Sequence, residues 1–252
     1  MNRVEQERNV AALVRPLSTR SVILSALLGH HPPVMPVSQL VRVGALFDIA
    51  EGTIRVALSR MTTSGELLRD GDGYRLNDRL IERQQLQDSS RQPQTSAWDG
   101  SWRMVAITAG RRSRSERDAF RNAMRAQRMA ELREGLWMRP DNIAVSASDG
   151  SESSDDLVYF TSYPRDPEPL VRELWDLNEW SERARALLSA MDESLALPDA
   201  FAVSAAVLRH LMVDPLLPAE LLDNDWPGAE LRTTYASFDS RFRAELEEQL
   251  RD

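Results

Sequence analysis

The apolar positions between residues 18 and 63 repeat with helical spacing in three short segments. A first helix is predicted from Ser18 to Gly29, because Ser18 or Thr19 can cap its start and a glycine followed by two prolines ends it. A second helix is predicted over Ser38–Leu46 and a third over Glu51–Thr63. The second helix is expected to bury Leu40, Val41 and Ala45.

Polar residues between and after these helices predict a tight turn and a hairpin. Asp48 lies between the second and third helices, where a turn needs a residue that tolerates positive φ. After Gly65, the short runs 66–69 and 74–76 flank Asp70-Gly71-Asp72-Gly73, which is typical of a hairpin turn. Three helices and a hairpin in this order predict a winged helix-turn-helix domain.

The third helix carries the residues with the clearest chemistry. Ile54, Leu58 and Met61 fall at i, i+4 and i+7 and form its predicted buried seam. The outward positions are Thr53, Arg55, Val56, Ser59 and Arg60. In a helix-turn-helix this face lies in the major groove, where arginine bonds guanine and Ser or Thr bonds bases or phosphates. We favour DNA binding over the alternative, a solvated face in a domain that binds protein.

Strand and helix patterns alternate beyond residue 95. The Gln- and Ser-rich segment Gln84–Thr95 is interpreted as a linker. Strands are predicted over Trp102–Thr108, Gly135–Arg139 and Leu157–Ser162, a helix over Ser115–Arg128, and a loop over Ser146–Asp156. This β-α-β-β order predicts a small ferredoxin-like unit.

Nearly every segment after Pro167 has helical spacing. Helices are predicted over Leu170–Leu177, Glu179–Met191, Asp199–Val213 and Ala229–Leu250. The sequence therefore predicts an α+β multidomain protein. Its expected parts are a polar arm (1–17), the winged helix-turn-helix (18–90), a ferredoxin-like α/β middle domain (91–165) and a helical C-terminal domain (166–252).

Charge is distributed unevenly along the 252 residues. The net charge is −8, but residues 15–90 carry +1, residues 91–140 carry +6 and residues 141–252 carry −15. An acidic total therefore does not argue against nucleic-acid binding by the first half. Cysteine is absent, which excludes disulfides and thiolate chemistry. No apolar run approaches the roughly 18 residues of a membrane span, so we expect a cytoplasmic protein.

A series of arginines follows the start of the middle domain. Arg114, Arg117, Arg121, Arg125 and Arg128 are spaced by three or four residues, so they share one face of the predicted helix; Arg111 and Arg112 precede it. Such a face can bind the phosphates of a coenzyme or of DNA. The alternative, which we favour from the residues alone, is a solvated face paired with acids of the C-terminal half.

Other candidate chemistry is sparse. Tryptophans could line a pocket for an aryl group, although they more often pack in a core. The six are Trp98, Trp102, Trp137, Trp175, Trp180 and Trp226. His30 and His31 lack a third ligand nearby in the sequence, and no Gly-x-Ser-x-Gly nucleophile elbow is present. We therefore predict no enzyme activity, no metal site and no cofactor.

Four stretches of the chain together resemble the PaaX family, the transcriptional repressors of phenylacetic-acid degradation in bacteria. They are Ile54–Met61, Trp98–Arg103, Gly135–Pro140, and Asp214–Pro218 with Leu221-Leu222 and Trp226–Gly228. The resemblance implies a dimeric repressor that an acyl-coenzyme A thioester, such as phenylacetyl-CoA, releases from DNA. By position it also implies that Arg55, Ser59 and Arg60 contact DNA, with Thr53 at the helix start.

The start of the third helix and the tip of the hairpin depart from what this family leads us to expect. Ala50 stands where a serine cap is expected, and Gly52 lies in the first turn of the third helix. Losing a cap costs about 0.5–2 kcal/mol of helix stability. The hairpin tip is acidic, which leaves only Arg69 and Arg75 at its base to meet phosphates.

The sequence thus predicts a transcriptional regulator, most simply a homodimeric repressor of a catabolic operon for phenylacetate or a related aromatic acid. Its partners would be operator DNA, a second copy and an acyl-CoA effector, with no membrane. The DNA contacts would be Thr53, Arg55, Val56, Ser59, Arg60, Arg69 and Arg75, and the effector contacts Arg111, Arg114, Arg117, Arg121, Arg125, Trp102 and Trp137. The alternatives are an enzyme acting on acyl-CoA thioesters and a winged-helix protein-interaction module.

Overall fold

The computed structural model describes residues 17–108, 113–143, 156–192 and 194–251. The chain divides into two compact units that do not follow its order. The first unit contains residues up to 91 together with 183–212 and 228–252. The second contains residues 92–182 and 213–227. The C-terminal helices therefore belong largely to the same unit as the N-terminal helices.

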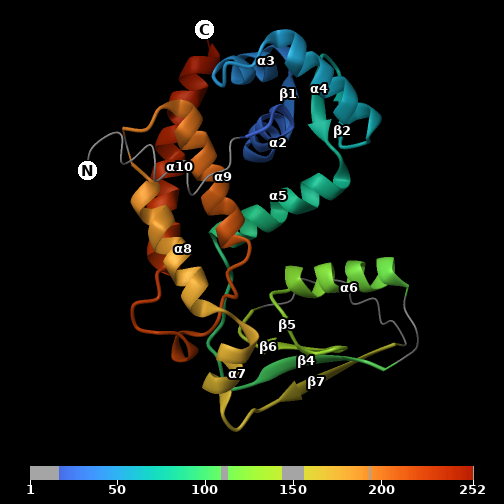
Figure 1. Cartoon of the computed structure of the whole chain (residues 1–252), viewed down its shortest axis with the longest axis vertical. Helices are drawn as coiled ribbons and strands as arrows, with labels where there is room; N and C mark the ends of the chain where they lie inside the picture. The colour runs from blue at the N-terminus through green and yellow to red at the C-terminus, as the bar shows by residue number, and fades with distance from the viewer. Residues whose placement is uncertain (1–16, 109–112, 144–155, 193, 252) are drawn as a thin grey trace. The chain divides into compact units, whose positions relative to one another are not determined.

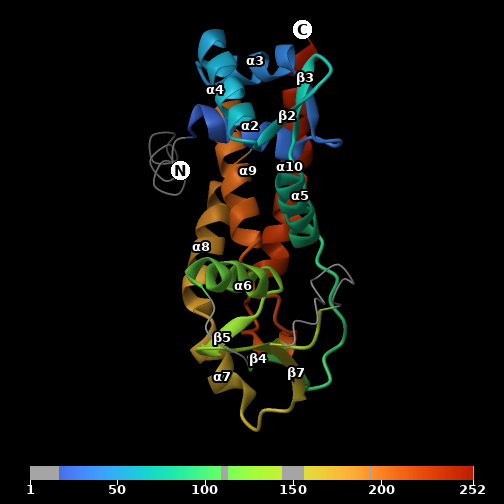
Figure 2. The same cartoon turned by 90° about the vertical axis from the view of Figure 1, so that its right-hand side faces the viewer.

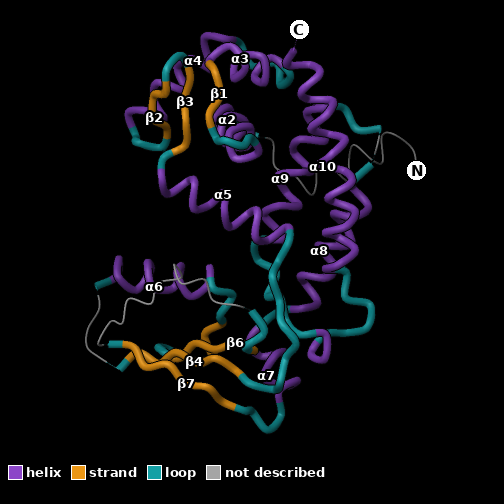
Figure 3. The backbone as a smooth tube through the Cα atoms, turned by 180° about the vertical axis from the view of Figure 1, so that it is seen from behind, coloured by secondary structure: helices purple, strands orange, loops and turns teal. Residues whose placement is uncertain are grey.

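The N-terminal part of the first unit is a winged helix-turn-helix (Figure 1). Its elements are α2 (Thr19–Gly29), β1 (Val34–Pro36), α3 (Val37–Ala45), α4 (Glu51–Thr63), β2 (Leu67–Asp70) and β3 (Gly73–Leu76). The three strands form an antiparallel sheet in the order β1-β3-β2, which Figure 3 shows from behind. This domain and the ferredoxin-like order described below confirm the predicted fold class.

Local sequence explains how these helices begin and turn. The Ser18 side chain accepts a hydrogen bond from the Ser21 amide at 3.2 Å, which confirms the predicted cap of α2. Asp48 has a φ of 54° in the turn between α3 and α4, as its position predicts. Gly44 lets these two helices approach closely, since a Cβ there would lie 2.6 Å from side-chain atoms of Ile54.

The buried face of α3 differs from the predicted one. Leu40 is buried as expected, but Ala45 is exposed, and Val43 and Gly44 are buried instead. The burial at i, i+3 and i+4 follows the helical period more closely than the predicted set. Strand β1 was not predicted, because it has only three residues and ends at Pro36.

The interpretation of Gln84–Thr95 as a linker is wrong for residues 84–91. Helix α5 spans Asp78–Arg91, and Gln84, Gln87 and Ser90 are buried on it. The Gln84 amide donates hydrogen bonds of 2.9 Å to the carbonyls of Leu28 and His30 at the end of α2. Polar composition suggested a linker, whereas these polar side chains satisfy backbone groups in the interior.

The first unit also contains two long helices and part of a third. They are α8 (Leu177–Ala190), which belongs to this unit from Arg183 onward, α9 (Leu197–Leu211) and α10 (Gly228–Arg251). Helices α9 and α10 lie side by side in Figures 1 and 2, and α5 also packs against α9. Val203, Val207, Leu211 and Leu231 are fully buried in this region.

The second unit is built on a four-stranded antiparallel sheet. Its elements are β4 (Trp102–Ile107), α6 (Arg114–Ala126), β5 (Ala130–Arg133), β6 (Leu136–Pro140), β7 (Leu157–Ser162), α7 (Pro167–Leu174) and the short helix η1 (Ala219–Leu221). The strand order is β5-β6-β4-β7, the second, third, first and fourth strands of this sheet along the chain. This is the ferredoxin-like order that the β-α-β-β pattern predicted.

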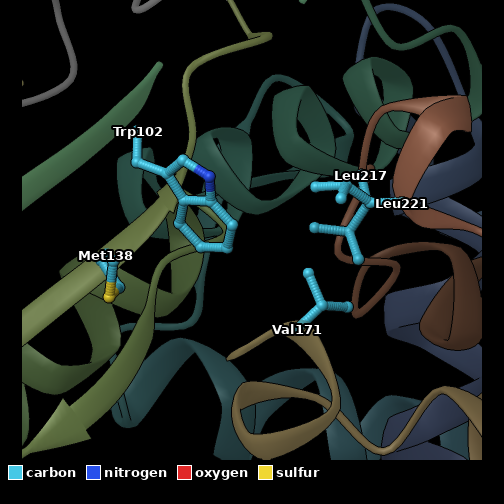
Figure 4. Close-up of a cluster of buried hydrophobic side chains, with 5 residues drawn as sticks. All are labelled: Trp102, Met138, Val171, Leu217 and Leu221. Atoms are coloured by element: carbon cyan, nitrogen blue, oxygen red, sulfur yellow. The ribbon is translucent and has the colours of Figure 1, made fainter. Parts of the chain in front are cut away.

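Each face of this sheet packs against its own layer. Helix α6 covers one face, where Phe120 and Met124 pack with Val105 and Trp137. The opposite face carries Trp102 and Met138, which form one buried cluster with Val171 of α7, Leu217 and Leu221. Figure 4 shows the Trp102 ring turned toward the two leucines. Figure 2 shows α6 and α7 on opposite sides of the strands.

The remaining predicted elements lie within three residues of the observed ones. The largest offset is at α7, which begins at Pro167 because proline is favoured in the first helical turn. Strand β5 was not predicted. The polar arm, Arg111, Arg112 and most of the loop 146–156 lie outside the described residues. Among the described helices, none is long and apolar enough to cross a membrane.

Candidate nucleic-acid interface

Helix α4 buries one face and exposes the predicted reading face. Ile54, Leu58 and Met61 are 0–3% exposed, which confirms the predicted seam. The side chains of Thr53, Arg55, Val56, Ser59 and Arg60 are all exposed. Val56, the apolar residue of this face, is 51% exposed. The structure therefore brings together five of the seven residues predicted to contact DNA.

The start of α4 has no side-chain cap. Ala50 occupies the N-cap position and makes no side-chain hydrogen bond, as its sequence predicts. Glu51 in the first turn binds Arg55, with 2.7 Å between Oε1 and Nε. Both side chains of this pair are more than half exposed. Such a pair is worth about 0–1 kcal/mol, so a stronger acceptor can displace Glu51 from Arg55.

The wing places its two arginines differently. The Arg69 guanidinium lies 4.7 Å from the centre of the Tyr74 ring, and Arg69 is exposed. Arg75 is half-buried and donates a hydrogen bond to the Leu76 carbonyl at 3.3 Å. Strands β2 and β3 pair up to Asp70 and Gly73, and both aspartates of the tip, Asp70 and Asp72, are exposed. Arg69 is thus the wing residue better placed to meet a ligand.

Aromatic side chains fix the turn that precedes α4. The Phe47 ring contacts Phe201 of α9 edge-on, with 5.1 Å between centroids. Phe201 in turn contacts Phe242 of α10 at 5.7 Å. No local sequence pattern indicates a role for Phe47, because its partners lie far along the chain. The helix-turn-helix is therefore anchored directly on the C-terminal helices of its own unit.

A buried polar cluster joins α5, α9 and α10. Asp239 accepts hydrogen bonds from Tyr235 at 3.1 Å and from Arg243 at 2.7 Å. Ser204 lies 3.0 Å from the Tyr235 hydroxyl, and Arg91 donates to that hydroxyl at 3.4 Å. Burial, followed by the Asp239 charge, raises the pKa of Tyr235, which therefore stays protonated. Arg243 also donates to the Gly29 carbonyl, so the cluster reaches the end of α2.

The arginine face of α6 is shorter than the spacing predicted. Arg114, Arg117, Arg121 and Arg125 are exposed on α6, and Arg121 lies 3.6 Å from Glu131 on β5. The expectation that Arg128 continues this face is wrong. The helix ends at Ala126, and Arg128 turns inward with a φ of 62° and is 8% exposed. The helical spacing does not apply once the chain leaves the helix.

The two tryptophans proposed for an effector pocket lie on opposite faces of the sheet. Trp102 pairs with Pro140 along β4 and β6, whereas Trp137 pairs with Val105. Side chains alternate between faces along a strand, so positions 102 and 105 point in opposite directions. Trp102 is 0% and Trp137 2% exposed, and each is packed in a different cluster. Trp102 and Trp137 therefore cannot line the same effector pocket.

A buried arginine holds the loop between α9 and α10 in the second unit. Arg139 is 2% exposed and donates hydrogen bonds to Asn142 at 2.8 Å and to the Leu216 carbonyl at 3.2 Å. Burial, helped by the charges of Arg103 and Arg128, lowers its pKa to about 9. It stays charged at neutral pH, and its bonds fix the backbone at Leu216, where φ is 52°.

No group of three potential metal ligands occurs in the described part of the chain. The two adjacent histidines have other partners. His31 lies 2.9 Å from Asp88, and His30 lies 2.6 Å from the Pro32 carbonyl.

The fold defines the class of protein: an α+β multidomain protein with a winged helix-turn-helix, a ferredoxin-like domain and C-terminal helices. Comparison with known proteins identifies the family. Residues 18–80 match the model of the PaaX-like protein, residues 95–173 that of the PaaX protein central Cas2-like domain, and residues 171–251 that of the PaaX-like protein C-terminal domain. The chain therefore belongs to the PaaX family of regulators.

The chain is also similar to a solved structure. The uncharacterized protein Rv0674 from Mycobacterium tuberculosis is 43% identical to this chain, over 92% of this chain and 98% of that one. The two structures superpose with a TM-score of 0.73. No curated protein matches the chain.

Proposed function

We propose that the protein is a DNA-binding transcriptional regulator with α4 as its recognition helix. It acts as a homodimeric repressor of a catabolic operon for phenylacetate or a related aromatic acid. The observation that carries the proposal is the exposed face of α4, where arginine, serine and threonine surround an exposed valine. Membership of a regulator family supports it independently.

The chemistry of this face matches that of the major groove. Arg55 and Arg60 can each donate two hydrogen bonds to guanine O6 and N7, and Ser59 can bond a base or a phosphate. Val56 offers an apolar contact for a thymine methyl group. Thr53, at the start of the helix, suits a phosphate oxygen. Two such helices, related by a two-fold axis, would read half-sites about one helical turn apart.

The effector is an acyl-CoA thioester such as phenylacetyl-CoA, and it releases the protein from DNA. The exposed arginines of α6 bind its phosphates, because guanidinium groups are suited to phosphate oxygens. The effector favours a dimer geometry in which the two recognition helices have the wrong spacing. The shift in DNA affinity is limited by the effector's preference for that geometry.

A gel shift against the promoter region beside the protein's own gene tests both parts. At physiological salt we expect specific binding that phenylacetyl-CoA abolishes. Specific binding that ignores the thioester would retain the regulator and remove this effector. Absence of salt-dependent DNA binding would favour a protein-interaction module, and turnover of aryl-CoA thioesters would favour an enzyme.

Replacing Arg55 tests the assignment of α4. We expect Arg55→Ala to weaken operator binding by roughly 1–3 kcal/mol, because one bidentate base contact is lost. The matched control is Arg83→Ala, which removes an exposed arginine from α5 of the same unit. Unchanged affinity in a folded Arg55→Ala protein, or an equal loss in the control, would contradict the assignment.

Reversing two charges on α6 tests the effector site. We expect Arg121→Glu with Arg125→Glu to raise the phenylacetyl-CoA concentration needed for release while leaving DNA affinity nearly unchanged. Titrating the effector into a preformed DNA complex measures the first quantity, and a salt-matched gel shift measures the second. If DNA affinity collapses and the effector response is retained, these arginines belong to the DNA-binding surface instead.

A further inference from the structure

Helix α4 carries a single acidic residue, and that residue lies at the start of the helix. Glu51 is the first residue of α4, and no other residue of this helix is acidic. Its side chain is 57% exposed. The first residues of a recognition helix are those that meet base edges. A carboxylate at this place is repelled by the phosphates of DNA of any sequence, so any benefit to DNA binding must come from sequence selection.

One oxygen of Glu51 holds the guanidinium of Arg55. Oε1 accepts a hydrogen bond from Nε of Arg55 at 2.7 Å and also lies 2.7 Å from its Nη2. A guanidinium has five N–H donors, and these contacts occupy at most two of them. The remaining donors, on Nη1 and Nη2, can still reach O6 and N7 of a guanine. Guanine can therefore bind Arg55 without displacing Glu51.

The second oxygen of Glu51 is left for another donor. Within the part of the chain that the structure describes, no group donates a hydrogen bond to Oε2 of Glu51. The next residue, Gly52, has no side chain, and a Cβ added there would meet no atom within 4 Å. No side chain at position 52 therefore stands between Glu51 and a base. The start of α4 presents a free acceptor beside the donors of Arg55.

Cytosine is the base whose major-groove edge suits a carboxylate. That edge offers the N4 amino group as a donor and no acceptor. Adenine also offers an amino group, N6, but its N7 acceptor lies beside it, and guanine and thymine offer only acceptors. A carboxylate that faces an acceptor loses its water without gaining a bond, which is costly for a charged group. Such a residue therefore selects cytosine by excluding other bases as well as by attraction.

We propose that Glu51 reads a cytosine of the operator through Oε2 while its Oε1 holds Arg55 on a guanine. Because one carboxylate makes both contacts, the two bases lie in the same base pair or in adjacent ones. Glu51 and Arg55 thus act as one unit that recognises a guanine and a cytosine together. The inference rests on the proposed function, since it requires α4 to enter the major groove, and it adds the bases that α4 selects.

Selection from a random-sequence duplex library tests this assignment. The full chain is bound to the library, and the recovered DNA is sequenced for wild type and for each variant. Wild type should enrich a sequence in which a cytosine lies within one base pair of a guanine. Arg55→Ala should erase the preference for the guanine, and Glu51→Ala the preference for the cytosine. Discrimination at the cytosine, measured by competition binding, should fall from roughly tenfold in wild type to about twofold or less in Glu51→Ala.

Glu51→Gln gives the sharpest signature, because an amide donates as well as accepts. Glutamine bonds adenine through N6 and N7 together. We expect this variant to select adenine where wild type selects cytosine, with the guanine preference retained. A role for Glu51 limited to helix stability, or to holding Arg55, would leave the preferred base at that position unchanged.

Glu82→Gln is the matched control. Glu82 is an exposed acidic residue of α5 in the same unit, and this variant makes the same change in net charge. It should select the wild-type sequence. A changed base preference in Glu82→Gln would assign the effect to net charge and overturn the cytosine contact. Circular dichroism confirms that each variant is folded.

The outcomes separate the role of Glu51 from the proposed function. An unchanged selected sequence in folded Glu51→Ala and Glu51→Gln, or loss of the guanine preference alone, would overturn the cytosine contact. So would erased positions that lie more than one base pair apart. Loss of the guanine in Arg55→Ala would in each case leave α4 as the recognition helix. If wild type enriches no sequence, the proposed regulator fails, and this inference fails with it.

Discussion

Helices α4 and α6 have the same length and both expose arginines, but they are held in different ways. Each has 13 residues. Helix α6 begins with a complete capping box, in which Ser113 and Glu116 satisfy each other's backbone amides. Helix α4 begins at Glu51, and its N-cap residue, Ala50, makes no side-chain hydrogen bond. In return, α4 buries three large side chains, whereas α6 buries only Met124 fully.

The difference shows that α6 depends on its own sequence and α4 on distant packing. The buried face of α4 is fixed at two points. Gly44 of α3 approaches Ile54 closely, and Phe47 in the preceding turn contacts Phe201. Its exposed face is thereby free to carry residues chosen for a ligand rather than for helix stability. The orientation of α4 can also respond to changes in α9 and α10, which hold the preceding turn through Phe201 and Phe242.

The largest effect is expected where α4 contacts α3. Gly44→Val places a side chain into the fully buried Ile54, whose atoms lie 2.6 Å from an added Cβ. Overpacking of this kind costs about 1–3 kcal/mol and pushes α4 out of position. Urea unfolding should show the loss of stability, and operator affinity should fall with it.

Gly52→Val is the matched control, because it makes the same substitution inside α4 itself. An added Cβ at Gly52 meets no atom within 4 Å. We expect its unfolding free energy to change by about 0.5 kcal/mol or less. Equal destabilisation by both variants would contradict the view that packing behind α4 holds it in place.

Substitutions at the N-caps of α4 and α6 should change the stability of the protein by smaller amounts and in opposite directions. Ala50→Ser should stabilise the protein by about 1 kcal/mol, because a hydroxyl would accept a bond from an amide of the first turn. Ser113→Ala should destabilise it by a similar amount at α6. Thermal unfolding of the two variants measures both changes. If Ala50→Ser has no effect, the start of α4 is already satisfied by its surroundings.

Elements governed by local spacing could be predicted from the sequence. The bounds of α4 and β7, the seam of Ile54, Leu58 and Met61, and the positive φ of Asp48 all follow from residue types within a few positions. The exposure of the reading face follows from the same period. Membership of the PaaX family was also apparent from short motifs spread over the chain.

What could not be predicted depends on partners that are distant in the sequence. Helix α5 was taken in part for a linker, because nothing local shows that Gln84 bonds the carbonyls at the end of α2. Phe47 gains its role only from Phe201. Arg128 was placed on a helix that ends before it, and the opposite placement of Trp102 and Trp137 follows from strand register.

The smallest predicted effect concerns the ion pair between Arg20 and Glu66. Arg20 of α2 binds Glu66 just after α4 and holds the pKa of that carboxyl below its ordinary value of 4.5. A lowered pKa contributes stability above pH 4.5 that is lost as the pH falls through the folded-state pKa. Because the Arg20 side chain is 55% exposed, the contribution is at most about 1 kcal/mol. Glu66→Gln should therefore be less stable than wild type at pH 7 and indistinguishable from it in acid.

Urea unfolding at pH 7 and in acid measures this difference. Glu131→Gln, which removes the local partner of Arg121, is the control. An equal gap between Glu66→Gln and wild type at both pH values would show that Glu66 acts through packing rather than charge.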